Sequence, residues 1–272
     1  MTIIEAVVLG VVQGVTEFLP ISSSGHLVIF QHLFRLKEPV VAFDISVHIG
    51  TLIAVITFFF HDIKEIIKAF IRVSILLLKT KTSRSISMKD LYARWLILII
   101  AGSIPTAVLG LAFHKIVERI FSSVFFVGIA LIITGLILWL SRNSKRPEKN
   151  IDSFSIKDAV IIGLAQGIAV LPGISRSGST IAAGLFLGIE RETAARFSFL
   201  LSIPAILVAT LLMVKDAFQD PLFNLETALT GAFISCIVGY LFLRFLVFIV
   251  KKGKLHFFSV YCWLLGLTAL FI

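Results

Sequence analysis

Two stretches of the chain repeat each other: GVVQGVTEFLPISSSGHL from Gly10 to Leu27, and GLAQGIAVLPGISRSGST from Gly163 to Thr180. They align without gaps at an offset of 153 residues, and seven of the first sixteen aligned positions are identical. Each stretch is apolar at its ends and is broken in the middle by a cluster of Pro, Gly and Ser. The sequence therefore predicts an internal repeat whose two copies share one broken-helix unit.

The breaks fall inside longer apolar stretches, residues 2–34 and 159–187. Irregular backbone is not tolerated against lipid, because its N–H and C=O groups would lack hydrogen-bond partners, so such breaks must be buried in protein or line a cavity. We therefore interpret both stretches as helix–loop–helix hairpins that enter a membrane and return to the same side.

The composition independently indicates an integral membrane protein. The chain is 58% hydrophobic, with a mean hydropathy of +1.02. Several apolar runs reach the ~18 residues that suggest a membrane-spanning helix. The candidate spans are residues 43–60, 95–112, 121–140, 197–214, 227–250 and 257–272. These features exclude a soluble, disordered or nucleic-acid-binding protein and predict an all-α fold.

The predicted organisation is one membrane domain, residues 1–272, made of two repeats at 1–145 and 155–272. Each repeat consists of a re-entrant hairpin followed by three transmembrane helices. Since a hairpin returns to its own side and three spans cross, the second repeat starts on the opposite face. The repeat is therefore expected to be inverted, which places the broken helix ends near the midplane of the membrane.

The positive charge predicts the orientation. The net charge is +9, and Lys and Arg collect in cytoplasmic loops of membrane proteins. If residue 1 lies outside, the inner segments contain eighteen of the 25 Lys and Arg residues and the outer segments contain five. The inner set includes Lys79, Lys81, Arg84, Lys89, Arg142, Lys145, Arg146, Lys251 and Lys252. We expect both termini outside, with residues 61–78 forming an amphipathic helix at the inner interface.

Ionisable residues in the hairpins are the main candidates for chemistry, because charge at membrane depth is expensive and usually functional. Glu17 aligns with Val170, Ser23 with Arg176, and His26 with Ser179. The first hairpin thus offers a carboxylate, hydroxyls and an imidazole, while the second offers a guanidinium. If the hairpin tips meet, these groups will lie on opposite walls of one site.

The turns have the composition of a phosphate site. Backbone N–H groups at a helix start point toward an anion, Gly allows close approach, and hydroxyls donate hydrogen bonds. Arg176 would add a bidentate fork. The predicted substrate-binding residues are Gln13, Ser22, Ser24, Gly25, Ser175, Ser177, Gly178, Ser179 and Thr180.

Structural roles compete with these functional ones. The serines could simply satisfy backbone groups freed by the breaks, Arg176 could be only a counterion for Glu17, and His26 could be a helix cap. His48, at the start of the first span, is expected to support or pack against the site rather than to act in catalysis.

At TEFLPISSSGH and PGISRSGST the sequence resembles the undecaprenyl-diphosphate phosphatase family, also called bacitracin-resistance proteins, over essentially the whole chain. The family's first motif has Glu or Gln, three residues, then Glu, and falls on Gln13 and Glu17. The resemblance implies hydrolysis of undecaprenyl diphosphate to undecaprenyl phosphate and phosphate in the bacterial plasma membrane, and the orientation predicted from charge makes the site open to the outer face. It also implies bacitracin resistance and a divalent cation, magnesium or calcium, at Glu17. Gln13 brings no charge, unlike members with two carboxylates.

The mechanism that we predict uses Arg176 and the loop amides to bind the diphosphate, Glu17 to hold the metal or orient a proton acceptor, and Ser23 as nucleophile with His26 as its acid/base partner. Direct attack by water is a variant. A polyprenyl-phosphate transporter or flippase is the alternative function, because inverted repeats with broken helices also occur in transporters. Expected partners are the lipid substrate and membrane lipids, not nucleic acid; a homodimer is left open.

Overall fold

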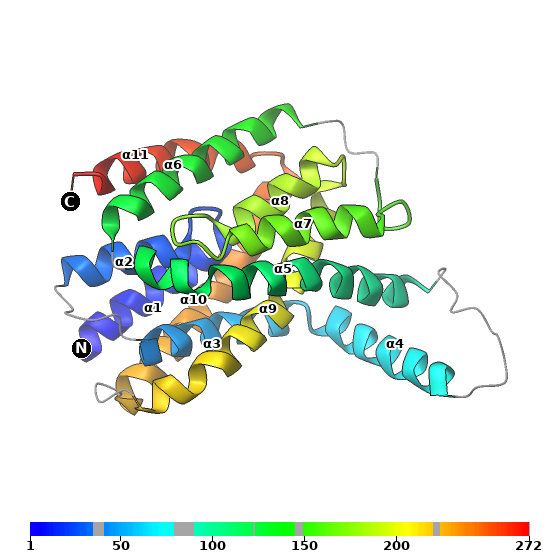
Figure 1. The fold of residues 1–272 in the computed structure, drawn as a ribbon, viewed down its shortest axis with the longest axis horizontal. Coiled ribbons are helices and arrows are strands. Elements are labelled where there is room, and N and C mark those ends of the chain that lie inside the picture. The colour runs from blue at the N-terminus through cyan, green and yellow to red at the C-terminus, as the bar shows by residue number, and fades with distance from the viewer. Residues whose placement is uncertain (35–40, 79–89, 122, 145–148, 220–223, 272) are drawn as a thin grey trace.

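The structure is a computed structural model that describes residues 1–34, 41–78, 90–121, 123–144, 149–219 and 224–271. Within these ranges every regular element is helical apart from one isolated β-bridge between Lys149 and Ile189. The α-helices are α1 (Ile3–Phe18), α2 (Ser23–Leu33), α3 (Val41–Phe58), α4 (Phe60–Leu78), α5 (Leu91–Phe121), α6 (Val124–Leu140), α7 (Ile156–Ile168), α8 (Arg176–Phe186), α9 (Arg191–Gln219), α10 (Leu225–Lys251) and α11 (Phe258–Ala269). The predicted all-α class is confirmed (Figure 1).

Four of the predicted spans are helices long and apolar enough to cross a membrane: Leu91–Phe113, Val124–Asn143, Arg191–Met213 and Leu225–Lys251. The first predicted span, 43–60, is α3, which meets α4 at a bend of 82°. The last, 257–272, is a shorter apolar helix, Leu255–Ala269. The protein is therefore a multi-pass membrane protein with four such helices in the described residues, or five if the bent pair is one span.

The bend between α3 and α4 separates an apolar helix from an amphipathic one. α4 carries exposed Ile67 and Phe70 among charged residues such as Lys64 and Lys68. Arg196 of α9 forms an ion pair with Asp62 of α4. An apolar face beside a cationic face is typical of a helix that lies in the membrane interface. This arrangement agrees with the interfacial helix predicted for residues 61–78.

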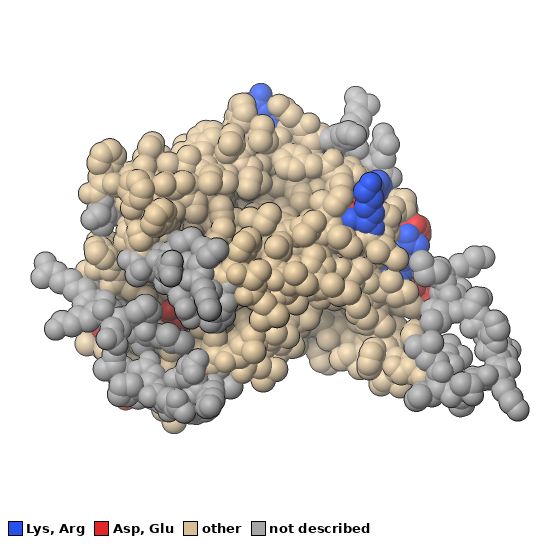
Figure 2. Space-filling view, in the orientation of Figure 1, with Lys and Arg blue, Asp and Glu red and all other residues tan. Residues whose placement is uncertain are grey.

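Most of the visible surface is uncharged (Figure 2), and many large hydrophobic side chains are exposed. Figure 2 shows a body with few charged side chains: Lys and Arg lie mainly at the end where α7 starts, with a further patch at the upper edge, while both termini lie at the opposite end (Figure 1). Apolar surface of this extent is what a lipid-facing protein exposes. Several lysines and arginines used for the orientation lie outside the described residues, namely Lys79, Lys81, Arg84, Lys89, Lys145 and Arg146.

The two hairpins, α1–α2 and α7–α8, enter the molecule from opposite ends (Figure 1). Both begin with a capping box at equivalent positions, Thr2 with Glu5 and Ser155 with Asp158. In such a box two of the free N–H groups at the helix start gain side-chain acceptors. The halves thus share their local design, and the relation between them as one inverted repeat stays a prediction.

Close helix packing depends on glycines that the repeat shares. α1 packs on α10, and α7 packs on α5. A Cβ on Gly10 would lie 2.9 Å from the Gly231 carbonyl oxygen, and one on Gly163 would lie 2.1 Å from that of Gly102. Only small residues let helix backbones approach this closely in a membrane. The identical glycines therefore fix both hairpins against their neighbouring spans.

Candidate active site

The tips of the two hairpins touch at the centre of the molecule. A Cβ on Gly25 would lie 3.2 Å from the Gly173 Cα, and a Cβ on Gly178 would lie 3.2 Å from the Pro20 Cβ. The Gly173 N–H also donates to Ser22 Oγ at 3.1 Å. At an offset of 153, Gly25 corresponds to Gly178 and Pro20 to Gly173, so the two contacts are equivalent. The tip-to-tip approach that the sequence suggested is therefore present.

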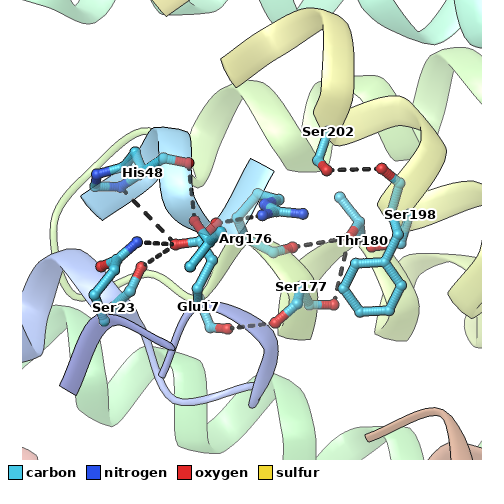
Figure 3. Close-up of polar contacts among 12 residues, drawn as sticks. Glu17, Ser23, His48, Arg176, Ser177, Thr180, Ser198 and Ser202 are labelled. Carbon is cyan, nitrogen blue, oxygen red and sulfur yellow. Dashed lines mark hydrogen bonds and ion pairs between the residues drawn. The ribbon is translucent and has the colours of Figure 1, made fainter. Parts of the chain in front are cut away.

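The carboxylate of Glu17 collects donors from both hairpins (Figure 3). Arg176 Nη2 donates to its Oε1. Ser23 Oγ donates to its Oε2 at 2.6 Å, and Gln13 Nε2 donates to the same oxygen at 3.0 Å. Glu17 is 8% exposed. Removing any one of these donors would leave a buried carboxylate undersatisfied, which is costly in a low-dielectric site.

Arg176 donates to this carboxylate through Nη2 and keeps a second donor, Nη1, without a partner among the described residues. It is the first residue of α8, and its side chain is 16% exposed. Its Nη1 is buried and has no partner among the described residues, and the same holds for the hydroxyl of Ser179 one turn further along. A guanidinium donor and a hydroxyl at a helix N-terminus are together suited to an anion. Arg176 is therefore both a counterion and a free donor.

The serines divide into caps and neighbours of caps. Ser22 and Ser175 are the N-caps of α2 and α8, and their hydroxyls accept from the N–H groups of Gly25 and Gly178. Ser24 and Ser177 each lie 3.4 Å from the capping hydroxyl, and Thr180 donates to backbone carbonyls and contacts Ser198. The scaffold role that competed with phosphate binding thus accounts for the two caps and for Thr180.

The contact predicted between Ser23 and His26 is not formed. His26 Nδ1 lies 2.7 Å from the Ser22 carbonyl oxygen, and its Nε2 lies 2.7 Å from the Tyr261 hydroxyl. Ser23 turns toward Glu17 instead. The reason is that Ser23 begins α2 while His26, one turn later, folds back onto the carbonyl of the preceding cap. His26 thus belongs to the cap of α2, and Glu17 is the group beside the Ser23 hydroxyl.

Residues outside the motifs complete the site. His48 of α3 places Nε2 3.9 Å from Glu17 Oε2, while its Nδ1 lies 2.7 Å from the Asp44 carbonyl oxygen. Thr134 of α6 contacts the turn of the second hairpin, at Gly173 and Ser175. Tyr261 of α11 contacts His26 beside the turn of the first hairpin. An ionisable residue in an apolar span signals His48 in the sequence. Nothing in the pattern signals Thr134 or Tyr261, which lie far from the turns along the chain.

The residues at Glu17 are compatible with a divalent cation. The Gln13 Oε1 atom is buried without a partner among the described residues, next to the carboxylate that its own amide nitrogen contacts. Carboxylate, amide and hydroxyl oxygens are the donors that magnesium and calcium prefer. Within the described ranges there is no cluster of three or more His, Cys, Asp or Glu, so protein atoms would supply only part of the coordination shell.

Fold and site together define a helical, multi-pass membrane protein with a carboxylate–serine–arginine centre between two broken helices. The family profile described as "Bacitracin resistance protein BacA" matches residues 6–268, and the chain belongs to this family. Proteins named "Undecaprenyl-diphosphatase" are similar along nearly their whole length. The one from Desulforapulum autotrophicum is 48% identical, covering 99% of this chain and 98% of its own. The one from Desulfatibacillum aliphaticivorans is 47% identical, covering 98% and 97%.

Proposed function

We propose that the protein hydrolyses undecaprenyl diphosphate to undecaprenyl phosphate and inorganic phosphate, and that it thereby recycles a cell-wall lipid carrier and confers bacitracin resistance. The observation that carries this proposal is the contact of Ser23 and Arg176, from two different hairpins, with one buried carboxylate. A hydroxyl beside a proton acceptor, facing a guanidinium, is the arrangement that phosphoryl transfer needs. Full-length similarity to proteins named for this reaction supports the substrate.

Substrate binding uses the unpartnered donors. The terminal phosphate is held by Arg176 Nη1, by the Ser179 hydroxyl and by the first N–H groups of α2 and α8. The prenyl chain stays in the lipid that surrounds the apolar helices. The charge that develops on the phosphoryl oxygens is stabilised by donors already in place, and this preorganisation is usually the largest catalytic contribution.

The chemical step begins at Ser23. Its Oγ attacks the terminal phosphorus, its proton passes to Glu17 Oε2 at 2.6 Å, and the bond between that phosphorus and the bridging oxygen breaks. Undecaprenyl phosphate leaves, and water then attacks the phosphoserine to release phosphate, while Glu17 returns the proton to Ser23 Oγ. In the variant with direct attack, Glu17 takes the proton from water and Ser23 only binds the phosphate.

A divalent cation would be held by Glu17, Gln13 Oε1 and oxygens of water and of the diphosphate. When bound, such an ion neutralises charge on the phosphate oxygens and so supports the leaving group. The protein's own groups still bind the phosphate, orient Ser23 and receive its proton.

The decisive experiment measures inorganic phosphate released from undecaprenyl diphosphate by the purified protein in lipid nanodiscs. Ser23→Ala distinguishes the two variants of the chemistry: loss of turnover together with a labelled phosphoserine in wild type supports covalent catalysis. Substantial turnover by Ser23→Ala eliminates it and favours activated water. Movement of labelled lipid across vesicles without phosphate release would instead indicate a flippase.

The site is proposed to open to the outer face of the bacterial plasma membrane. In a background with Cys236→Ala and Cys262→Ala, a cysteine replacing Asp220, outside the described residues, should react with an impermeant thiol reagent added to intact cells. A cysteine replacing the exposed Asn150 should not react. The reverse labelling would place the site on the cytoplasmic side.

A further inference from the structure

Ser22 is the single residue other than glycine with a positive φ in the described part of the chain, at φ 67° and ψ 98°. Such backbone conformations are unfavourable for residues with a Cβ and persist only where surrounding contacts enforce them. The equivalent residue of the second hairpin, Ser175, has an ordinary φ of −72°. The strain is therefore specific to the turn that carries Ser23.

Two contacts hold this strained backbone. The Ser22 hydroxyl accepts from the N–H of Gly173 at 3.1 Å, across the junction of the hairpins. The Ser22 carbonyl oxygen lies 2.7 Å from His26 Nδ1, and His26 is buried at 3% exposure. A carbonyl oxygen can only accept, so Nδ1 carries the hydrogen. In the neutral ring Nε2 is then an acceptor, as the tautomer rule requires.

That acceptor is occupied by Tyr261 from the last helix of the chain. The Tyr261 hydroxyl lies 2.7 Å from His26 Nε2, and the two rings are stacked at 5.7 Å with an angle of 3°. Tyr261 is 45% exposed, so part of its ring lies at the surface of the molecule while its hydroxyl reaches the buried imidazole. The bond fixes which nitrogen of His26 carries the hydrogen and in which plane the ring lies.

The turn of the second hairpin is held in a corresponding way by a side chain from the first half of the chain. Thr134 of α6 donates to the Gly173 carbonyl at 2.8 Å and accepts from the Ser175 N–H at 3.0 Å. α6 and α11 pack on each other, with Gly128 and Gly266 at their contact. Each turn is thus fixed by a hydroxyl from the last helix of the opposite half.

We infer that Tyr261 is a positioning residue that acts through His26: its hydroxyl holds the imidazole on the Ser22 carbonyl, keeps Ser22 in its strained conformation, and so directs Ser23 at Glu17. His26 on this account supports the nucleophile and does not exchange its proton. The inference rests on the proposed function for its kinetic consequence, and on the contacts alone for its structural one.

The kinetic test compares phosphate release by wild type, Tyr261→Phe, His26→Ala and the double variant, with Tyr240→Phe as a control. Tyr240 of α10 packs on Phe58 of α3. Tyr261→Phe loses one hydrogen bond, which corresponds to a decrease in kcat of roughly 3- to 10-fold with KM within about twofold. In the His26→Ala background the same change should have no further effect, because interacting residues are non-additive.

Normal kcat in Tyr261→Phe, or an equal loss in both backgrounds, would overturn the inference. A readout independent of turnover is the ¹⁵N spectrum of the histidine-labelled chain, with His26 assigned by its absence in His26→Ala. Wild type should show the Nδ1–H tautomer with a hydrogen-bonded Nε2, and Tyr261→Phe should lose that Nε2 bond. An Nε2–H tautomer in wild type would refute the positioning role even if no phosphate is released, whereas absent turnover with the expected spectrum would refute only the proposed function.

Discussion

Replacing Arg176 with Lys tests the site most directly, because the charge stays and only the planar fork is lost. Arg176 Nη2 donates to Glu17 while Nη1 is free for the substrate. A single ammonium on a flexible stem cannot keep both geometries. Loss of one preorganised donor to a transition-state oxyanion costs about 2–4 kcal/mol, which corresponds to a decrease in kcat of roughly 30- to 900-fold.

The assay is phosphate release from undecaprenyl diphosphate in nanodiscs, with insertion and thermal stability measured on the same preparation. Arg244→Lys is the matched control, since Arg244 is an exposed arginine on the spanning helix α10. It should retain full activity. If Arg176→Lys kept near-normal kcat with intact folding, the guanidinium fork would have no part in the reaction and the proposed phosphate-binding geometry would be wrong.

Further predictions concern the carboxylate of Glu17, the neighbouring amide of Gln13, and Gly173 in the turn of the second hairpin. Glu17→Gln should nearly abolish phosphate release, because the Ser23 hydroxyl loses its proton acceptor; substantial release would assign the proton to another group. Gln13→Glu should be active and should lower the magnesium or calcium concentration needed for half-maximal rate, and an unchanged metal titration would mean that position 13 does not reach the ion. Gly173→Ala should lower the melting temperature more than Gly188→Ala. Both have positive φ, but only a Cβ at 173 meets neighbours, at 2.6 Å, and equal shifts would contradict the packing argument.

The sequence predicts the helices and the hairpins well because a membrane tolerates irregular backbone only where protein surrounds it or a cavity adjoins it. The Pro and Gly at each tip mark both turns, and the charged residues at membrane depth, Glu17 and Arg176, mark the site. The 82° bend between α3 and α4 agrees with the change predicted there, from a spanning helix at 43–60 to an interfacial helix at 61–78, although no Pro or Gly lies in the aromatic run from Phe58 to Phe60.

The contact predicted between Ser23 and His26 is absent for a geometric reason. Residues three apart share a helix face, so Ser23 and His26 look like partners. Ser23 is instead the first residue of α2, where its side chain reaches back across the turn to Glu17. His26 is captured by a residue 235 positions away, Tyr261, and a contact of that range is set by tertiary packing rather than by local pattern.

The aligned positions 23 and 176 explain why a chain with two similar hairpins has a single carboxylate centre among its described residues. Ser23 and Arg176 occupy equivalent places at the two tips, and they donate to the two oxygens of the same carboxylate. A second centre would need a carboxylate at Val170, the counterpart of Glu17. However, α7 ends at Ile168 whereas α1 continues to Phe18, so position 170 lies in the turn and is 37% exposed. Because α7 ends earlier, the tips of both hairpins contact the single carboxylate of Glu17, and neither hairpin alone contains the serine hydroxyl, the carboxylate and the guanidinium.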